Sequence, residues 1–318
     1  MDGYINGDSY PSSVVAEYSI YQFIYTFHMP LFFLVSGFLF SLAYVENDGG
    51  VKSSKLKTQL LDIIVIYIVF STIMVTFKVF CSGFVNHQAS FSELLSIGWK
   101  PIAQYWYLYV LAIFYLIHIL LVKCKRTILL AVILFCLSAC AAAMVPASKA
   151  FTLYQSLFTI PFFFIGTLMQ RSGREPNWRV AFIGVFVAAL LCLLFWKHGT
   201  ESLFQVVSLT PVVNTFIALG FCLFFWKAFS SVKWLDNKAL EICGRYCLEI
   251  YVTHCFLTAG FRSVFTALGM TNFWLSLVLN TALSTILPIL FAMALERIGL
   301  HDLLFRPVHY LRRLRTAK

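Results

Sequence analysis

The sequence predicts an all-α polytopic membrane protein, because of its composition, its long apolar stretches and the placement of its basic residues. Of the 318 residues, 60% are hydrophobic and only 12% are charged, and the mean hydropathy is +0.82. Soluble domains carry about 25% charged residues. This chain has too few polar side chains to cover a water-exposed surface, so a soluble fold is excluded.

Nine stretches are long and apolar enough to cross a membrane as helices, since a spanning helix needs about 20 mostly apolar residues. Strands of a membrane barrel would alternate in polarity, and runs such as DIIVIYIVFSTIMV do not. The nine expected spans lie near residues 18–45, 58–80, 102–122, 127–146, 151–170, 179–196, 206–228, 246–268 and 273–296.

The basic residues predict the orientation of these spans, because Lys and Arg concentrate in cytoplasmic connections. Of the 24 basic residues, 19 fall in alternate connections and in the C-terminal tail. We therefore expect an extracytoplasmic N-terminal segment (1–17), a helical bundle (18–298) and a basic cytoplasmic tail (299–318). The protein is expected in the plasma membrane as a multi-pass protein, with its N-terminus outside.

The first 17 residues are unusual for the start of a membrane protein. They contain no Lys or Arg and carry Asp2, Asp8 and Glu17. A signal peptide would begin with a positive region followed by an apolar one, and neither is present. Two interpretations stay open: the first helix inserts tail-first, or a preceding span is missing from the chain as given.

The net charge of +10 favours attraction to anionic membrane lipid. Nucleic acid is not an expected partner, because no soluble domain is present to organise the basic residues. The grouping of Cys243, Cys247, His254 and Cys255 could suggest metal ligands. Cysteine is also a common small apolar residue in membrane helices, so no metal site is predicted.

Titratable residues inside spans are costly and each invites a functional and a structural interpretation. Asp62 lies near one end of its span, where it can reach lipid headgroups, so its role is expected to be structural or interfacial. Arg245 and Glu249 are four residues apart, so on one helix they would share a face and pair. That pair would be a structural latch or one wall of a polar cavity. His254 follows Glu249 by five residues and should point elsewhere.

The stretch TFHMPLFFLVSGFLF, from Thr26 to Phe40, contains a histidine beside a proline. Pro30 removes one helical N–H and displaces the carbonyl of Thr26, and freed backbone groups in a membrane must find partners. Ser36 and Gly37 are small enough to let another helix or a ligand approach. His28 is therefore either part of a polar functional pocket or a cap on the freed carbonyl.

FHMPLFFLVSGFLF resembles the second-helix signature of the acyltransferase-3 family of integral membrane acyltransferases. Three further stretches resemble family segments and occur in the expected order. They are KSSKLKTQLLDIIVIY, then YWYLYVLAIFYL (105–116), then CGRYCLEIYVTHCF (243–256), in which Cys247 stands where Ser is usual.

The resemblance implies a ten-helix bundle in the bacterial inner membrane that transfers an acyl group, typically acetyl from acetyl-CoA, to hydroxyls of envelope or secreted glycans. Family members carry a histidine that ends an [RK]-x10-H pattern on helix one. Here Glu17, not a basic residue, stands eleven residues before His28. The chain is therefore expected to lack helix one, which leaves its activity as given open.

The same resemblance implies roles for particular residues. Acyl-CoA is expected as a co-substrate, not as a bound cofactor, with its phosphates held by Lys52, Lys55 and Lys57. His28 is the candidate catalytic residue: it is expected to line the acceptor-side pocket and to assist the histidine of helix one, by hydrogen-bonding the acceptor hydroxyl or by orienting the base. The expected pocket-lining residues are Ser36, Trp106, Glu249 and His254.

A transporter or flippase for a glycan or lipid is the alternative function. Polar residues within spans and a proline-broken helix fit it equally well. Transporters often show inverted or parallel repeats between their halves, and none is evident in this sequence. A purely structural scaffold explains neither the broken helix nor the order of the motifs.

Overall fold

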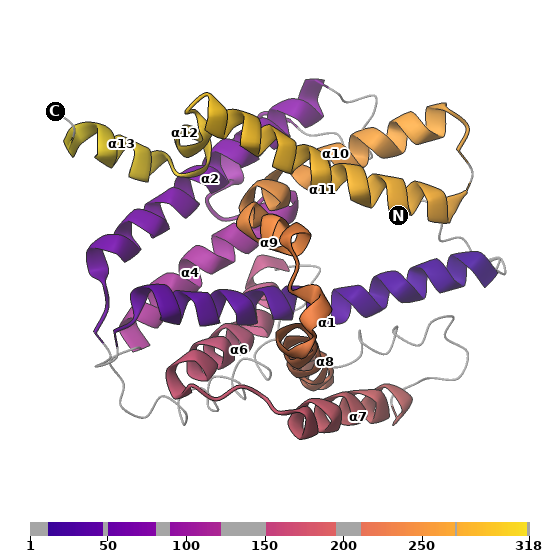
Figure 1. Ribbon diagram of the computed structural model, residues 1–318. Helices are drawn as coiled ribbons and strands as arrows, with labels where there is room; N and C mark the ends of the chain where they lie inside the picture. Colours follow the sequence, from indigo (N-terminus) through magenta and orange to yellow (C-terminus); the bar gives the residue numbers. More distant parts are fainter. Residues whose placement is uncertain are drawn as a thin grey trace. The chain divides into compact units, whose positions relative to one another are not determined.

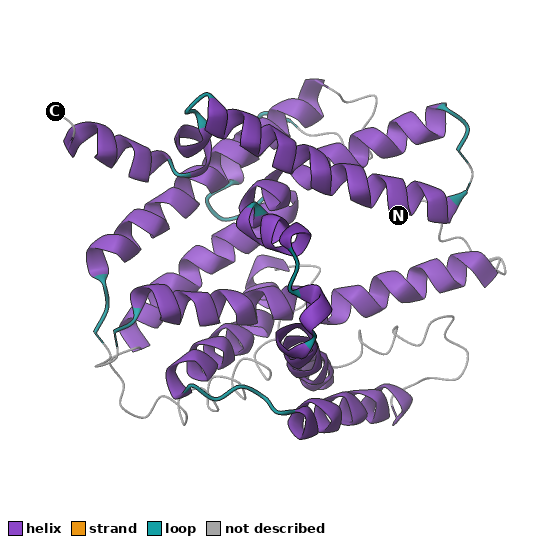
Figure 2. Cartoon of the chain, in the orientation of Figure 1, coloured by secondary structure: helices purple, strands orange, loops and turns teal. Residues whose placement is uncertain are grey.

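The computed structural model describes residues 12–46, 50–80, 90–121, 151–194, 211–270 and 272–316. Every regular element in these residues is a helix (Figure 2). The chain forms two compact units, one made of residues 1–50 and 121–232 and the other of residues 51–120 and 233–318.

Five described helices are long and apolar enough to cross a membrane. They are α1 (Ser12–Tyr44), α2 (Ser53–Phe80), α6 (Phe151–Ser172), α8 (Pro211–Ser231) and α11 (Phe273–Arg297). Three shorter or more polar helices correspond to further predicted spans: α4 (Trp106–Leu121), α7 (Trp178–Leu194) and α10 (Cys247–Ala267). The predicted all-α membrane class is confirmed, while the span predicted at 127–146 lies outside the described residues.

In the first unit, α1 packs against α6 and α8, and α7 packs against α8 (Figure 1). The α1–α6 contact is unusually close because a glycine on each helix meets the backbone of the other. A Cβ on Gly37 would lie 1.9 Å from the carbonyl oxygen of Phe163, and one on Gly166 would lie 1.9 Å from that of Leu34. The close approach predicted at Gly37 is thus confirmed.

Polar contacts reinforce the same crossing. Between the helices, the Thr167 hydroxyl of α6 donates to the carbonyl of Gly37 on α1 at 3.3 Å, and within α6 it also contacts the carbonyl of Phe163 at 3.0 Å. One turn further on, the Ser41 hydroxyl donates to Gln170 Oε1 at 2.7 Å. Such interhelical hydrogen bonds between small polar residues are typical of helix packing in membranes, and they hold α1 in a defined position.

The second unit contains α2, α4 and the C-terminal helices. Helix α10 pairs with α11, and α9 (Lys238–Arg245) contacts both. The short helix η2 (Ala103–Tyr105) lies against α2 and α10. Short helices α3 (Glu93–Ser96) and η4 (Lys233–Leu235) lie in the connections. The contact between η2 and α10 is made by hydroxyls: Tyr105 donates to the carbonyl of Val252 at 2.8 Å, and Tyr251 donates to that of Gln104.

The chain ends in α12 (His301–Phe305) and α13 (Pro307–Thr316), which both contact α2. Asp62 Oδ1 accepts a hydrogen bond from the backbone N–H of Val308 at 2.7 Å, in the first turn of α13. A carboxylate stabilises a helix start by this contact. Asp62 is 4% exposed, which supports the structural interpretation of this residue and not the interfacial one. Asp62 anchors the tail.

We expect Gly37→Ala to destabilise the protein by about 1–3 kcal/mol, the range for overpacking a filled interface, because its Cβ would meet backbone that cannot rotate away. Gly260→Ala is the matched control, since Gly260 lies on α10 with open space where its Cβ would be. Thermal unfolding of both variants in detergent measures the difference. Equal Tm values for the two variants would contradict the close α1–α6 contact.

Candidate functional site

The most polar described site of the second unit begins at a break between two helices. Helix α9 ends at Arg245, Tyr246 has φ −100° and ψ 24°, and α10 begins at Cys247. Glu249 therefore lies in the first turn of α10. A negative charge is stabilised there by the unpaired N–H groups and the helix dipole.

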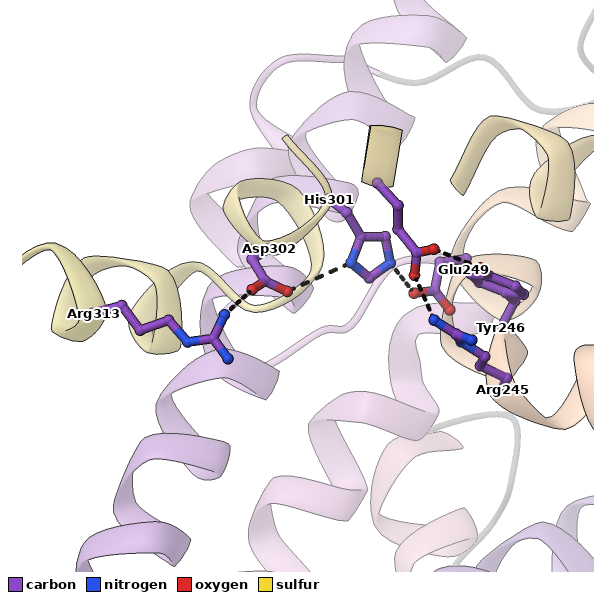
Figure 3. A network of polar contacts seen from close by, with 7 residues as sticks. Arg245, Tyr246, Glu249, His301, Asp302 and Arg313 are labelled. Carbon is purple, nitrogen blue, oxygen red and sulfur yellow. Dashed lines mark hydrogen bonds and ion pairs between the residues drawn. The ribbon is translucent and has the colours of Figure 1, made fainter. Parts of the chain in front are cut away.

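Glu249 forms a buried contact with a histidine from the C-terminal segment. Its Oε1 lies 2.7 Å from His301 Nε2, and the two side chains are 6% and 11% exposed (Figure 3). A carboxylate oxygen only accepts, so His301 Nε2 donates the hydrogen bond. The other carboxylate oxygen, Oε2, is buried and has no hydrogen-bond partner among the described residues.

The contact continues from His301 into α13. His301 Nδ1 lies 3.6 Å from Asp302 Oδ1, and Asp302 Oδ2 accepts from Arg313 Nη1 at 3.0 Å (Figure 3). Asp302 is partly exposed and Arg313 largely so. The series therefore runs from a buried acid on α10 to an exposed cation on α13, and ties the three helices together.

A second branch joins the helix break to α11. Glu296 accepts the Tyr246 hydroxyl at 2.8 Å and Arg245 Nη2 at 3.3 Å. The predicted pairing of Arg245 with Glu249 is therefore wrong. It assumed one continuous helix, whereas the break at Tyr246 places the two residues on α9 and α10 and gives each a different partner.

His28 and Ser36 both lie on α1, in the first unit. His28 is half-buried, and its Nδ1 lies 2.9 Å from the carbonyl oxygen of Ile24. Because a carbonyl only accepts, Nδ1 carries the proton in this contact, and in the neutral ring Nε2 then holds the free lone pair. The carbonyl bound is that of Ile24, one turn back, and not the Thr26 carbonyl that Pro30 displaces.

The other predicted site residues lie in the second unit. Lys52 precedes α2, and Lys55 and Lys57 lie in its first turns, all three exposed. Trp106 is the first residue of α4 and is buried. It directly follows the η2 segment that is hydrogen-bonded to α10.

His254 and Glu249 face different neighbours, as their spacing predicts. His254 Nδ1 lies 2.7 Å from the carbonyl oxygen of Tyr251 and 3.1 Å from that of Ile250. Its Nε2 lies 3.3 Å from Cys255 Sγ. Nδ1 therefore donates to the backbone, while Nε2 is left to accept from the thiol.

His301 and Asp302 were missed by sequence reasoning. They follow the last apolar stretch within GLHDLLF, a segment whose charges were interpreted only as orienting the chain. His301 and its partner are 52 residues apart, and no periodic pattern links them. In the described part of the chain, no group of three or more His, Cys, Asp or Glu side chains could hold a metal ion.

Comparison with known proteins identifies the family. The acyltransferase domain of the acyltransferase-3 type matches residues 1–293, most of the chain. The protein belongs to the acyltransferase-3 family. The resemblance inferred from the four ordered motifs is therefore confirmed.

A curated protein to which this chain is similar is nodulation protein NolL of Mesorhizobium japonicum (strain LMG 29417 / CECT 9101 / MAFF 303099). The two are 27% identical over 194 residues, which cover 59% of this chain and 49% of the relative. The chain thus spans about half the length of the curated relative it matches. No solved structure matches the chain.

We expect His301→Ala to destabilise the protein by about 3–5 kcal/mol, because removing one member of a buried pair leaves the other charge uncompensated. Arg245→Ala is the control: its pair with Glu296 is exposed, with 68% of the arginine side chain accessible, and such pairs contribute about 0–1 kcal/mol. Thermal unfolding compares the two. If both variants lower Tm equally, the Glu249–His301 contact does not stabilise the fold.

Proposed function

We propose that this membrane acyltransferase moves an acetyl group from acetyl-CoA to a hydroxyl of an envelope or secreted glycan. The match over residues 1–293 supports acyl transfer, and the ordered motifs support the class of donor and acceptor. The main structural support for this reaction is the hydrogen bond that His28 Nδ1 donates to the backbone carbonyl of Ile24.

In this reaction the acceptor hydroxyl attacks the thioester carbonyl, the new C–O ester bond forms, and the C–S bond breaks to release the CoA thiolate. A base must take the hydroxyl proton. The hydrogen bond from His28 Nδ1 to Ile24 selects the neutral tautomer whose Nε2 is basic. His28 Nε2 can therefore accept a hydrogen bond from the acceptor hydroxyl and assist its deprotonation, and the proton removed is available to the leaving sulfur.

The acyl donor is assigned to the basic residues at the start of α2. CoA is a cytoplasmic polyanion, and the exposed Lys52, Lys55 and Lys57 offer cations to its phosphates. This assignment requires the proposed topology, in which the protein lies in a bacterial inner membrane with its N-terminus outside and its C-terminus in the cytoplasm. The basic tail would then contact anionic lipid. Residues proposed to line the acyl-transfer route are Ser36, Trp106, Glu249 and His254.

The function is tested by mass spectrometry of surface and secreted glycans from a gene-deletion strain and the complemented strain. Acetyl groups lost on deletion and restored on complementation are expected, because the proposed reaction adds an ester of defined mass to sugar hydroxyls. Unchanged O-acylation together with altered glycan export would instead favour the transporter or flippase function.

For His28 we expect His28→Ala to lower turnover about 100-fold, the low end for a lost acid–base group, with membrane expression preserved. His28→Gln separates the two possible roles, since glutamine keeps hydrogen bonding but cannot take up a proton. Acetylated glycan is quantified in both strains. Full activity of the alanine variant would show that His28 only satisfies the carbonyl of Ile24.

A further inference from the structure

The Glu249 carboxylate is only half used by the protein. Oε1 accepts from His301, while Oε2 has no hydrogen-bond partner among the described residues on a side chain that is 6% exposed. Burying a charged acceptor without a donor is costly. A group that donates a hydrogen bond to Oε2 would remove this cost, so the geometry favours a ligand with an N–H or O–H donor.

The partner that orients this carboxylate comes from beyond the matched acyltransferase domain. The family match ends at residue 293, whereas His301 and Val308 lie after it and bind Glu249 and Asp62 within it. Asp62 is fully explained as a cap of α13. The burial of Glu249 is not fully explained in this way. Its contact with His301 uses Oε1 and fixes the position of Oε2, which has no partner among the described residues.

The place of Glu249 in the chain indicates which substrate it meets. It lies in the first turn of α10, just after the exposed Cys247 and the exposed Arg245, so the surface is one helical turn away. In the orientation proposed above, this end of α10 is cytoplasmic, where acyl-CoA is available. The pantetheine arm of CoA carries a hydroxyl and two amide N–H groups, which are the donors that Oε2 requires.

We propose that Glu249 is a binding subsite for the pantetheine arm of the acyl donor, with Oε2 accepting from its hydroxyl or amide N–H. His301 is a positioning residue that holds the carboxylate by Oε1. The identity of the donor rests on the proposed function. The lysines at the start of α2 act on a different part of the same molecule, its phosphates.

The test is calorimetric titration of the purified full chain with CoA and, separately, with pantetheine, which lacks the nucleotide phosphates. Glu249→Gln keeps the shape and the bond to His301 but puts an NH2 group where Oε2 was, so a donor meets a donor. Loss of a hydrogen bond to a charged group corresponds to roughly a tenfold or larger loss of affinity. We expect that loss for both ligands.

Two control variants separate the subsite from its surroundings. Neutralising Lys52, Lys55 and Lys57 together should weaken CoA binding and leave pantetheine binding unchanged. Asp62→Asn perturbs the other buried tail contact and should leave the pantetheine affinity unchanged. His301→Gln should weaken pantetheine binding, because the carboxylate it positions is released.

Carbodiimide labelling of wild-type Glu249, read by mass spectrometry, gives a test without any substitution: pantetheine should slow the labelling.

Equal affinities of wild type and Glu249→Gln, or labelling unaffected by pantetheine, would overturn the subsite. The contact between Glu249 and His301 would then have a structural role only. Binding lost in Glu249→Gln without any glycan acetylation by the wild type would refute the proposed acceptor reaction and leave the subsite standing. A wild type that binds neither ligand would overturn both.

Discussion

Every polar group that enters the apolar interior of this protein must find its partner within the protein, because hydrocarbon offers none. Several threonine hydroxyls on the described apolar helices follow this constraint. Thr58, Thr72 and Thr159 each donate to the carbonyl four residues earlier on the same helix. The buried carboxylates of Asp62 and Glu249 instead take their partners from other helices. Those longer-range contacts organise the site.

Two buried carboxylates show the consequence. Asp62 on α2 and Glu249 on α10 each accept a hydrogen bond from the C-terminal helices, the first from the N–H of Val308 and the second, at Oε1 only, from His301. Phe305 lies between these two contacts in sequence, is 1% exposed, and stacks on Phe70 of α2 with ring centroids 5.9 Å apart. The segment after the last long apolar helix is therefore packed into the second unit by apolar and polar contacts together.

The features that could be predicted from the sequence are those encoded within one stretch of chain. Apolar length predicted the helices, and the small side chain of Gly37 predicted a close helix approach that Gly166 completes from α6. The site was predicted only in part, because its contacts join distant segments. Glu249 was recognised as a costly polar residue, but its partner lies 52 residues later in a polar segment. The predicted Arg245–Glu249 pair was wrong because the four-residue spacing assumes a continuous helix and cannot reveal the break at Tyr246.

That break also explains why the stretch 243–256 contains so many polar and aromatic residues. Tyr246 reaches Glu296 on α11, Glu249 reaches α12, and Tyr251 reaches η2, so the start of α10 joins three elements of its unit. The two oxygens of Glu249 share one negative charge. Oε1 accepts from His301, which begins α12, and Oε2 has no hydrogen-bond partner among the described residues. A donor bound at Oε2 would therefore complete the partners of this carboxylate while the C-terminal helices hold it in place from Oε1.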